Sequence, residues 1–325
     1  MPPTGDGMGR VVRWIARRDD FVIASHTDPD GDSLGSSLAL AIMLDQIGKR
    51  SEVVIQQPFP RRFGWLPECS RVQTCDAVSR RARASILVEC SDFARAGVAG
   101  LDRIESLNID HHSQNAMFAN VNWIDPQVAA TSMMVARLAD PLGAQITPPI
   151  ATLLYVAVLT DTGSFHHSNT DVAALQFAAD MVKLGADASG IAEAVYGNVP
   201  AARVFLLADA LATLKLEEDG RVAWMVLWRR DFDRRGGGDT EGLINQAQSI
   251  AGVEVALLFK EVGRDRFRVS LRSDASVDVA EVAASYGGGG HPRAAGCQLD
   301  GSLEEVRASI MAKIRSIRGG ARGVG

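Results

Sequence analysis

The stretch that decides the fold of this chain is FVIASHTDPDGDSLGSSLALAIML, residues 21–44. Residues 21–24 are all apolar and predict a buried strand, and residues 35–44 predict the helix that follows it. The polar segment between them, residues 26–32, holds one imidazole and three carboxylates within seven residues. It therefore occupies a strand-to-helix loop, which is where open α/β sheets bind their ligands.

The composition of this loop is that of a metal site. His26 offers an imidazole nitrogen, and Asp30 and Asp32 can direct carboxylates at two neighbouring ions if Gly31 relaxes the backbone between them. Oxygen ligands with a minority of imidazole suit manganese or magnesium better than a structural zinc, which prefers thiolates. For this segment alone, the alternative is a solvated turn in which Asp32 or Ser33 caps the helix.

The composition of the whole chain narrows the class of protein. Its 325 residues, 46% hydrophobic and 22% charged, are ordinary for a soluble enzyme of two domains. Lys and Arg total 34 against 39 Asp and Glu, so the net charge of −5 provides no global basic field for long nucleic acid. Four cysteines without CxxC spacing fit a reducing cytoplasm. We expect a cytoplasmic protein without a membrane partner, since no apolar run is long enough to span a bilayer.

The order of apolar runs predicts two domains. Short β-rich runs alternate with helical stretches up to about residue 184, which argues for a parallel α/β sheet in a first domain, residues 1–190. The predicted elements of this domain are strands at residues 53–55, 85–88 and 107–109 and helices at residues 150–159 and 171–184.

A looser segment, residues 191–205, predicts a linker to a second domain, residues 206–325. There, Asp219-Gly220 lies between two β-rich runs and predicts a hairpin. Helices are expected near residues 241–250, 277–286 and 303–318, so this smaller domain is predicted to be a mixed α+β unit.

Further metal-ligating side chains follow the core elements of the first domain. Glu89 follows residues 85–88, Asp110-His111-His112 follows residues 107–109, and Asp161 follows the apolar run that ends at residue 159. Polar groups at the carboxyl ends of parallel strands converge on one crevice. Two imidazoles and four carboxylates would then hold two divalent ions with one carboxylate bridging: His26, Asp30, Asp32, Glu89, His111 and Asp161.

A two-metal site with open positions indicates phosphoester hydrolysis. It lowers the pKa of a bridging water and neutralises phosphate oxygens during an in-line displacement. His112 would point toward the scissile phosphate or the leaving oxygen, and Asp110 would orient the neighbouring imidazole. A purely structural hydrogen bond is an equally good explanation of either residue taken alone.

The second domain contains an anion-binding pattern, GGGGHPRAAG, at residues 287–296. Its glycines expose backbone N–H groups, and His291 with Pro292 predicts a helix start, so the segment suits a phosphate or carboxylate. The alternative is a flexible surface loop. Arg272, at a predicted strand end, could grip a phosphate through its bidentate fork or form a surface ion pair.

In their order along the chain, these motifs resemble the DHH phosphoesterase family. Its signature is Asp110-His111-His112 with the His-x-x-x-Asp-x-Asp pattern that begins at His26, and Arg272-Ser273 and the GGGGH segment match its associated C-terminal domain. TDTGSF at residues 160–165 and TEGLIN at residues 240–245 are similar to the branch of bifunctional oligoribonucleases and pAp phosphatases. The resemblance extends from about residue 20 to about residue 318.

This resemblance implies an active-site cleft between the two domains and two Mn²⁺ ions, with Mg²⁺ or Co²⁺ as alternatives. One ion would be held by His26, Asp30 and residue 89, and the other by Asp32, His111, Asp161 and the same residue 89. The family usually has Asp at the position of Glu89. The residues implied to grip the substrate end are Arg272, Ser273, Gly288, Gly289, Gly290 and His291.

The function implied is that of a metal-dependent phosphohydrolase that degrades very short oligoribonucleotides or dephosphorylates 3′-phosphoadenosine 5′-phosphate (pAp). A homodimer is compatible with the resemblance. Three alternatives stay open: a cyclic-dinucleotide phosphodiesterase, an inorganic pyrophosphatase or exopolyphosphatase, and a sensor that binds nucleotides without hydrolysing them. The GGGGH segment argues against pyrophosphate, which would favour a cluster of Lys and Arg, and only Glu89 suggests the sensor.

Overall fold

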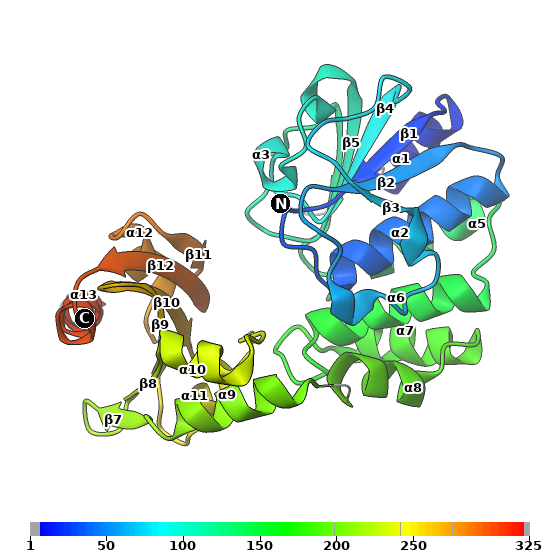
Figure 1. Ribbon diagram of the computed structural model, residues 1–325. Coiled ribbons are helices and arrows are strands. Elements are labelled where there is room, and N and C mark those ends of the chain that lie inside the picture. Colours follow the sequence, from blue (N-terminus) through cyan, green and yellow to red (C-terminus); the bar gives the residue numbers. More distant parts are fainter. Residues whose placement is uncertain (1–6, 198, 241, 275, 322–325) are drawn as a thin grey trace. The chain divides into compact units, whose positions relative to one another are not determined.

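A computed structural model describes residues 7–197, 199–240, 242–274 and 276–321, except the side chains of His291 and residues 319–321 (Figure 1). The chain divides into two compact units, Met1–Asn198 and Val199–Gly325, here called unit 1 and unit 2. This division falls within residues 191–205, the segment expected to be a linker.

Unit 1 is built on a parallel sheet of six strands in the order β3-β2-β1-β4-β5-β6. β1 and β4 pair in parallel at its centre, and the chain runs outward from them in opposite directions. Such a reversal of strand order opens a crevice at the carboxyl ends of the two central strands. The strands are β1 (Phe21–Ala24), β2 (Ser51–Ile55), β3 (Val72–Thr74), β4 (Ala84–Val88), β5 (Glu105–Asp110) and β6 (Val121–Ile124).

Helices cover both faces of this sheet (Figure 1). Alternate residues of β1 show why: Phe21 and Ile23 enter the larger core with α2 and α6, whereas Val22 and Ala24 pack on the other side with α3. The helices are α1 (Gly7–Ala16), α2 (Gly31–Gln46), α3 (Phe93–Ala96), α4 (Thr131–Arg137), α5 (Ala139–Leu142), α6 (Pro148–Asp161), α7 (Val172–Lys183) and α8 (Ala188–Ala192), with a π-helix at Glu193–Gly197 and 3-10 turns at Arg61–Phe63, Cys69–Arg71 and Leu101–Arg103.

Two glycines of α2 let it pack closely on α6. A Cβ at Gly35 would lie 2.4 Å from the carbonyl oxygen of Leu153, and one at Gly31 would lie 2.3 Å from Oγ1 of Thr160. Real Cβ atoms do not approach other atoms so closely. The small residues therefore bring the first turn of α2 next to the last turn of α6, which ends at Asp161.

Unit 2 contains a mixed sheet in the order β11-β12-β10-β9-β8-β7, in which only the β8–β9 pair is parallel. α12 and α13 pack on one face, and α9, α10 and α11 cover the part of the other face formed by β8 and β9. The elements are α9 (Ala201–Leu211), β7 (Lys215–Glu217), β8 (Val222–Leu227), α10 (Arg229–Arg235), α11 (Ile244–Gln248), β9 (Val255–Gly263), β10 (Arg266–Ser273), α12 (Val279–Ala284), β11 (Gly289–His291), β12 (Ala294–Asp300) and α13 (Leu303–Ala321).

These architectures confirm the predicted fold class, a parallel α/β domain followed by a mixed α+β domain. The helix start predicted at His291 and Pro292 is wrong, because β11 pairs with β12 in an antiparallel hairpin instead. Glycine allows this tight pairing: a Cβ at Gly288 would lie 2.2 Å from the carbonyl oxygen of Gly296, and one at Gly290 would lie 2.4 Å from that of Ala294.

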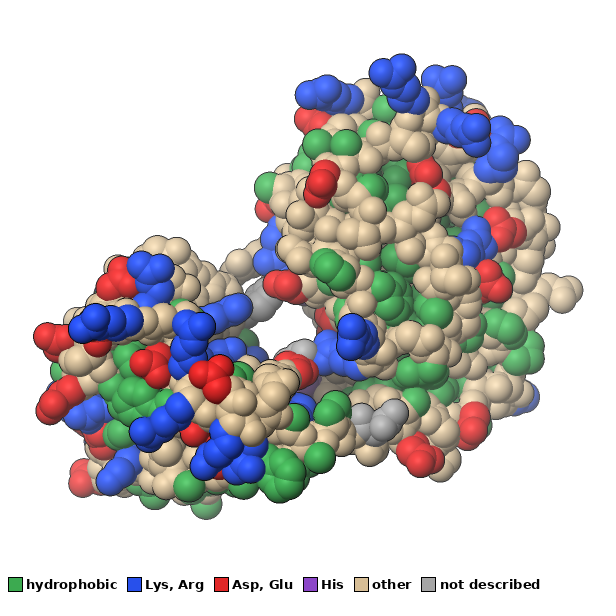
Figure 2. Space-filling view, viewed as in Figure 1, with side chains coloured by type: hydrophobic (Ala, Val, Ile, Leu, Met, Phe, Trp, Pro, Cys, Tyr) green, Lys and Arg blue, Asp and Glu red, His purple; other side chains and the backbone are tan. Residues whose placement is uncertain are grey.

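Acidic and basic side chains are interspersed over unit 2 on the face that Figure 2 shows.

Over the described ranges, no single helix is both long and apolar enough to cross a membrane. One bent pair of helices, Ala188–Gly197 with Ala201–Leu211, meets the requirement by length and composition alone.

The contact between α2 and α6 leads to a first prediction. Gly35→Ala should lower the free energy of unfolding by about 1–3 kcal/mol, because its Cβ has no room beside Leu153. Denaturant unfolding followed by intrinsic fluorescence measures this change. As a control in the same unit, the exposed Gly64, where the nearest atom to a Cβ lies at 3.3 Å, should change stability by no more than about 0.5 kcal/mol when replaced by Ala. Equal stability of the two variants would contradict the packing argument.

Candidate metal centre

The polar residues of unit 1 gather at the carboxyl ends of its central strands. His26 follows β1, Glu89 follows β4, and His111 follows β5. The beginning of α2 adds Asp30 and Asp32, and α6 ends at Asp161. All six predicted ligands therefore belong to one unit and to the crevice at its switch point.

Asp30 is the N-cap of α2. Its Oδ1 accepts a hydrogen bond of 2.9 Å from the backbone N–H of Ser33, and the Ser33 hydroxyl accepts one of 2.9 Å from the backbone N–H of Asp30. Asp30 therefore caps α2, and not Asp32 or Ser33, the caps that the sequence offered as the alternative to a metal site. The other oxygen, Oδ2, lies 3.7 Å from Nε2 of His26. Burial would raise the pKa of Asp30, but His26 and the bonds from Ser33 lower it to about 2.

Asp32 is buried and is held by the start of α4. Its Oδ2 accepts a hydrogen bond of 2.7 Å from the backbone N–H of Thr131, and its Oδ1 accepts bonds from the N–H of Ser132 at 3.1 Å and the hydroxyl of Ser36 at 2.8 Å. Burial, followed by repulsion from Asp30, raises the pKa of Asp32, and His111 offsets part of this rise. The carboxylate is thus fixed in position while its charge is left incompletely compensated.

Glu89 has a strained backbone and a buried side chain. Its φ of 61° is left-handed, which is uncommon outside glycine, and its backbone N–H donates a 3.2 Å bond to the carbonyl of Ile109 on β5. The side chain is 3% exposed and accepts a hydrogen bond from the Thr131 hydroxyl. Burial and repulsion from Asp32 and Asp110 raise the pKa of Glu89 well above its usual range.

His111 directs a ring nitrogen at two carboxylates. Its Nδ1 donates a 3.1 Å hydrogen bond to the carbonyl oxygen of Val128, since a carbonyl only accepts, and this leaves Nε2 to face the crevice. Nε2 lies 3.5 Å from Oε1 of Glu89 and 3.7 Å from Oδ2 of Asp161, and it has no hydrogen-bond partner within the described part of the chain. Nε2 is therefore a buried donor atom whose neighbours are carboxylate oxygens, the usual partners of imidazole around a divalent cation.

Asp161 adds to the excess of negative charge. Burial and repulsion from Asp32 raise its pKa to about 7, although His111 offsets part of the effect. The amide of Asn169 donates a 3.1 Å bond to its Oδ2. Crowded carboxylates whose pKa values are raised by one another are stabilised when a divalent cation replaces the protons.

Two groups of donors are close enough to share an ion: Asp32, His111 and Asp161, and separately Glu89, His111 and His112. Within each group the donor atoms lie within 4.8 Å of one another. The first group agrees with the ligand set implied by the family resemblance. The second group contains His112, whereas the set implied for the other ion has His26 and Asp30 beside residue 89. His26 and Asp30 lie near each other, with 3.7 Å between Nε2 and Oδ2. The chemistry of these donors fits hard or borderline divalent ions.

Asp110 positions His112 rather than His111. Its Oδ1 lies 2.7 Å from Nδ1 of His112, and its Oδ2 accepts a 2.7 Å bond from the amide of Asn115, which also donates to the carbonyl of Cys90. Burial would lower the pKa of His112, but Asp110 and the surrounding carboxylates raise it. His112 therefore retains its proton to a higher pH than an ordinary histidine.

The sequence analysis missed four residues that hold the site together: Asn115, Thr131, Ser132 and Asn169. The Thr-Ser pair is a recognisable helix start, yet no local signal reveals that this helix points at a carboxylate 99 residues earlier in the chain. Asn115 and Asn169 are ordinary loop residues by composition. Their roles follow from tertiary contacts alone.

The substrate-binding residues predicted for unit 2 occupy neighbouring positions of its sheet. Arg272 and Ser273 end β10, where the Arg272 guanidinium donates to the carbonyl of Leu271 and the Ser273 hydroxyl accepts a bond from the N–H of Val277. Gly289 and Gly290 belong to β11, preceded by Gly288. The side chain of His291 lies outside the described part of the structure.

Known proteins resemble the chain along nearly its whole length. The family described as "DHH family, N-terminal domain" matches residues 20–158, and the DHHA1 domain matches residues 216–317. A protein of Thermus thermophilus named "Bifunctional oligoribonuclease and PAP phosphatase NrnA" is 32% identical over 296 residues, which cover 90% of this chain and 88% of the relative. The protein of that name from Mycoplasma genitalium is 27% identical over 320 residues, covering 94% and 96%.

Among solved structures, an exopolyphosphatase-related protein from Bacteroides fragilis has a TM-score of 0.90 and 25% sequence identity, with 97% of each chain covered. Both units are thus recognised in the same order in other proteins.

The buried Nε2 of His111 and the crowded carboxylates predict that divalent metal stabilises the folded chain. Mn²⁺ at 100 times its dissociation constant should stabilise the folded chain by about 2.7 kcal/mol, measured by thermal unfolding. Calorimetric titration should show Mn²⁺ affinity about tenfold weaker or worse in Asp161→Asn and His111→Ala. His166→Ala, which removes an exposed histidine a few residues from Asp161, should bind as wild type does. Unaltered affinity in the first two variants would exclude these residues from the metal site.

Proposed function

Because the chain belongs to the DHH family, in the branch of the bifunctional oligoribonucleases and PAP phosphatases, we propose that it hydrolyses very short oligoribonucleotides and removes the 3′-phosphate of pAp. It is an enzyme of the phosphohydrolase class. The observation that carries the proposal is the buried Nε2 of His111, which has no hydrogen-bond partner within the described ranges and lies 3.5 and 3.7 Å from the carboxylates of Glu89 and Asp161. Such a set of donors suits a divalent cation, and phosphoester hydrolysis uses one.

We propose six residues as the ligands of two divalent ions, with Glu89 bridging. Bound ions would neutralise the oxygens of the reacting phosphate and acidify a water molecule, so that hydroxide is supplied near neutral pH. Mn²⁺ is the proposed ion, with Mg²⁺ and Co²⁺ as alternatives, because oxygen donors outnumber imidazole. The proposed ligands are His26, Asp30, Asp32, Glu89, His111 and Asp161.

The protein contributes positioned charges and a proton. Two backbone N–H groups of α4 hold Asp32, and the hydroxyl of Thr131 holds Glu89, so neither carboxylate has to reorganise when substrate enters. Asp110 orients His112 and raises its pKa. A protonated His112 can bind a phosphate oxygen or donate its proton to the leaving oxygen, which is the role we propose for it.

In unit 2, we propose that the end of β10 and the β11–β12 hairpin bind the rest of the substrate. Arg272 offers a fork that matches phosphate oxygens, and Ser273, the next residue of the strand, is buried on the other face of the sheet. The glycines of the hairpin allow a ligand to approach the backbone. The residues proposed for this role are Arg272, Ser273, Gly288, Gly289, Gly290 and His291.

The comparisons favour nucleotide substrates over the alternatives. Relatives from two organisms that cover this chain nearly completely are named for oligoribonucleotides and PAP, not for pyrophosphate, cyclic dinucleotides or sensing. We further propose that the protein acts in the cytoplasm on short RNA. A homodimer is compatible with this proposal.

A side-by-side assay tests the function. With Mn²⁺, the purified chain should release AMP from pAp and mononucleotides from a linear diribonucleotide, while a longer RNA, cyclic di-AMP and pyrophosphate should turn over much more slowly. The expectation follows from a site that holds a small charged substrate and from a net charge of −5 that gives long RNA no general attraction. Chromatographic product analysis distinguishes the five substrates. Consumption of pyrophosphate alone would refute the proposal.

Replacing the proposed bridging carboxylate tests the metal mechanism. Glu89→Gln should reduce Mn²⁺-dependent hydrolysis by at least about 100-fold. Replacing a residue that only hydrogen-bonds a metal ligand typically costs about 10- to 100-fold in activity, so a larger loss indicates a ligand. Glu89→Asp keeps the ligating group and should retain more activity than the Gln variant. Glu105→Gln, an exposed change on β5 of the same unit, is the control and should be as active as wild type. Normal turnover by Glu89→Gln would remove Glu89 from the metal site.

A further inference from the structure

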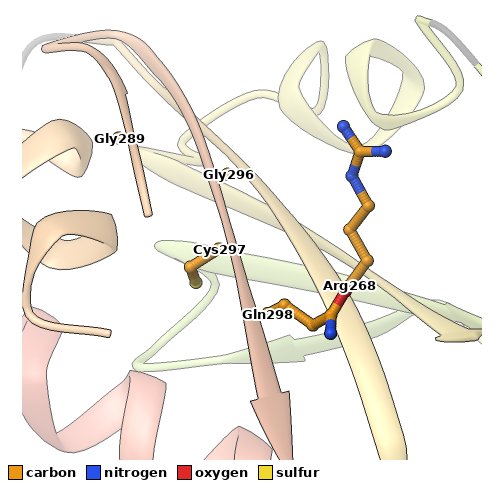
Figure 3. A pocket seen from close by; sticks show the side chains of 5 residues that line it. All are labelled: Arg268, Gly289, Gly296, Cys297 and Gln298. Atoms are coloured by element: carbon orange, nitrogen blue, oxygen red, sulfur yellow. The ribbon is translucent and has the colours of Figure 1, made fainter. Parts of the chain in front are cut away.

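A pocket of about 330 Å³ opens on the sheet of unit 2, lined by Arg268, Gly289, Gly296, Cys297 and Gln298 (Figure 3). It lies on the sheet face away from α12 and α13. Phe267 and Val269 pack into the core beneath those helices, so Arg268 between them points to the opposite face. In Figure 3, the side chain of Gln298 stands on the same side as Arg268, and that of Cys297 on the other.

Three polar side chains form a row across this face. Arg268 on β10 is the direct cross-strand partner of Lys260 on β9 and of Gln298 on β12, and paired residues share a face of the sheet. Nζ of Lys260 donates a 2.8 Å hydrogen bond to the Thr240 hydroxyl. Arg268 is exposed and makes no ion pair with any residue in the described ranges. Arg268 and Gln298 of this row line the pocket, and Lys260 lies beside Arg268 on the next strand.

Two cations on directly opposed positions repel each other. The effect is visible at Lys260, whose pKa is lowered first by burial and then by Arg268, with Asp239 offsetting part of the shift. An anion that contacts both groups would relieve this repulsion. A phosphate is suited to the place, because guanidinium and ammonium groups are the usual donors to its oxygens.

Glycine leaves space beside this row. A Cβ at Gly289 would meet no atom within 4 Å, and one at Gly296 would come no closer than 3.5 Å to the carbonyl oxygen of Val269. Neither glycine has a positive φ, so backbone conformation does not require glycine there. The missing side chains instead leave room for a ligand above strands β11 and β12.

We propose that Lys260, Arg268 and Gln298 bind a phosphate group of the nucleotide other than the one that is hydrolysed. This subsite would distinguish substrates that carry a 5′-phosphate from those that lack it. It is separate from the residues proposed at the end of β10, because Arg272 pairs across the sheet with Ala256 and Ala294 rather than with Lys260 and Gln298. The identification of the ligand as a nucleotide rests on the proposed function.

Direct binding tests the subsite without requiring hydrolysis. AMP and adenosine are titrated calorimetrically into the full chain without added metal, so that the phosphate is not captured at the metal centre. Wild type should bind AMP more tightly than adenosine, and Arg268→Gln and Lys260→Gln should each weaken AMP binding about tenfold to hundredfold. The control is Arg266→Gln, on the same strand and face but paired with Asp300, which should keep the wild-type affinity. Circular dichroism verifies that the variants are folded.

Two outcomes would overturn the subsite: equal affinity of wild type for AMP and adenosine, or unchanged AMP affinity in both variants. A kinetic arm separates this result from the proposed function. With Mn²⁺, the ratio of kcat/KM for pAp to kcat/KM for adenosine 3′-monophosphate should fall about tenfold or more in Arg268→Gln and stay constant in Arg266→Gln. If wild type hydrolysed neither compound, the proposed function would fail, while the AMP titration would still decide the subsite.

Discussion

The constraint on which unit 1 depends is the burial of several carboxylates at one place. Asp32, Glu89 and Asp161 have raised pKa values because they share a poorly solvated crevice and repel one another, and His111 offsets only part of the effect at Asp32 and Asp161. Unpaired buried charge is costly, so the surroundings must compensate it. Part of the compensation is visible in the protein, as backbone N–H groups of α4 and the hydroxyl of Thr131. The remainder calls for cations.

This constraint explains several local features that otherwise lack a reason. Gly31 and Gly35 let α2 lie on α6 closely enough for the helix start and the helix end to face one crevice. Glu89 has a left-handed backbone directly after β4, where a continued strand would alternate its side chains between the two faces. The strained conformation is held by a bond to β5 and by the Thr131 hydroxyl, so the cost in backbone energy is offset by fixing the carboxylate.

An element of this structure could be predicted from the sequence where a local pattern of residues specifies it. The central strands β1, β2, β4 and β5 were predicted because each contains a buried apolar run. The edge strands β3 and β6 were not predicted, because their residues are half-buried or exposed and form no buried apolar run. The hairpin at Gly289 was mistaken for a helix start because glycine is compatible with either, and only pairing with β12 decides. Ligand candidates carry a recognisable composition, whereas Thr131 and Asn169, which hold them, do not.

The net charge of −5 conceals two local environments of opposite sign. Unit 1 concentrates carboxylates at its switch point, and unit 2 places Lys260 opposite Arg268 on neighbouring strands. Each is incomplete in the protein alone: the first calls for cations, and the second for an anion. Phosphate chemistry meets each requirement taken by itself, because a phosphate can bind through metal ions at the first site and directly through Arg and Lys at the second. The distribution of charge within each unit, rather than the total, is therefore the physical basis for expecting a short nucleotide substrate.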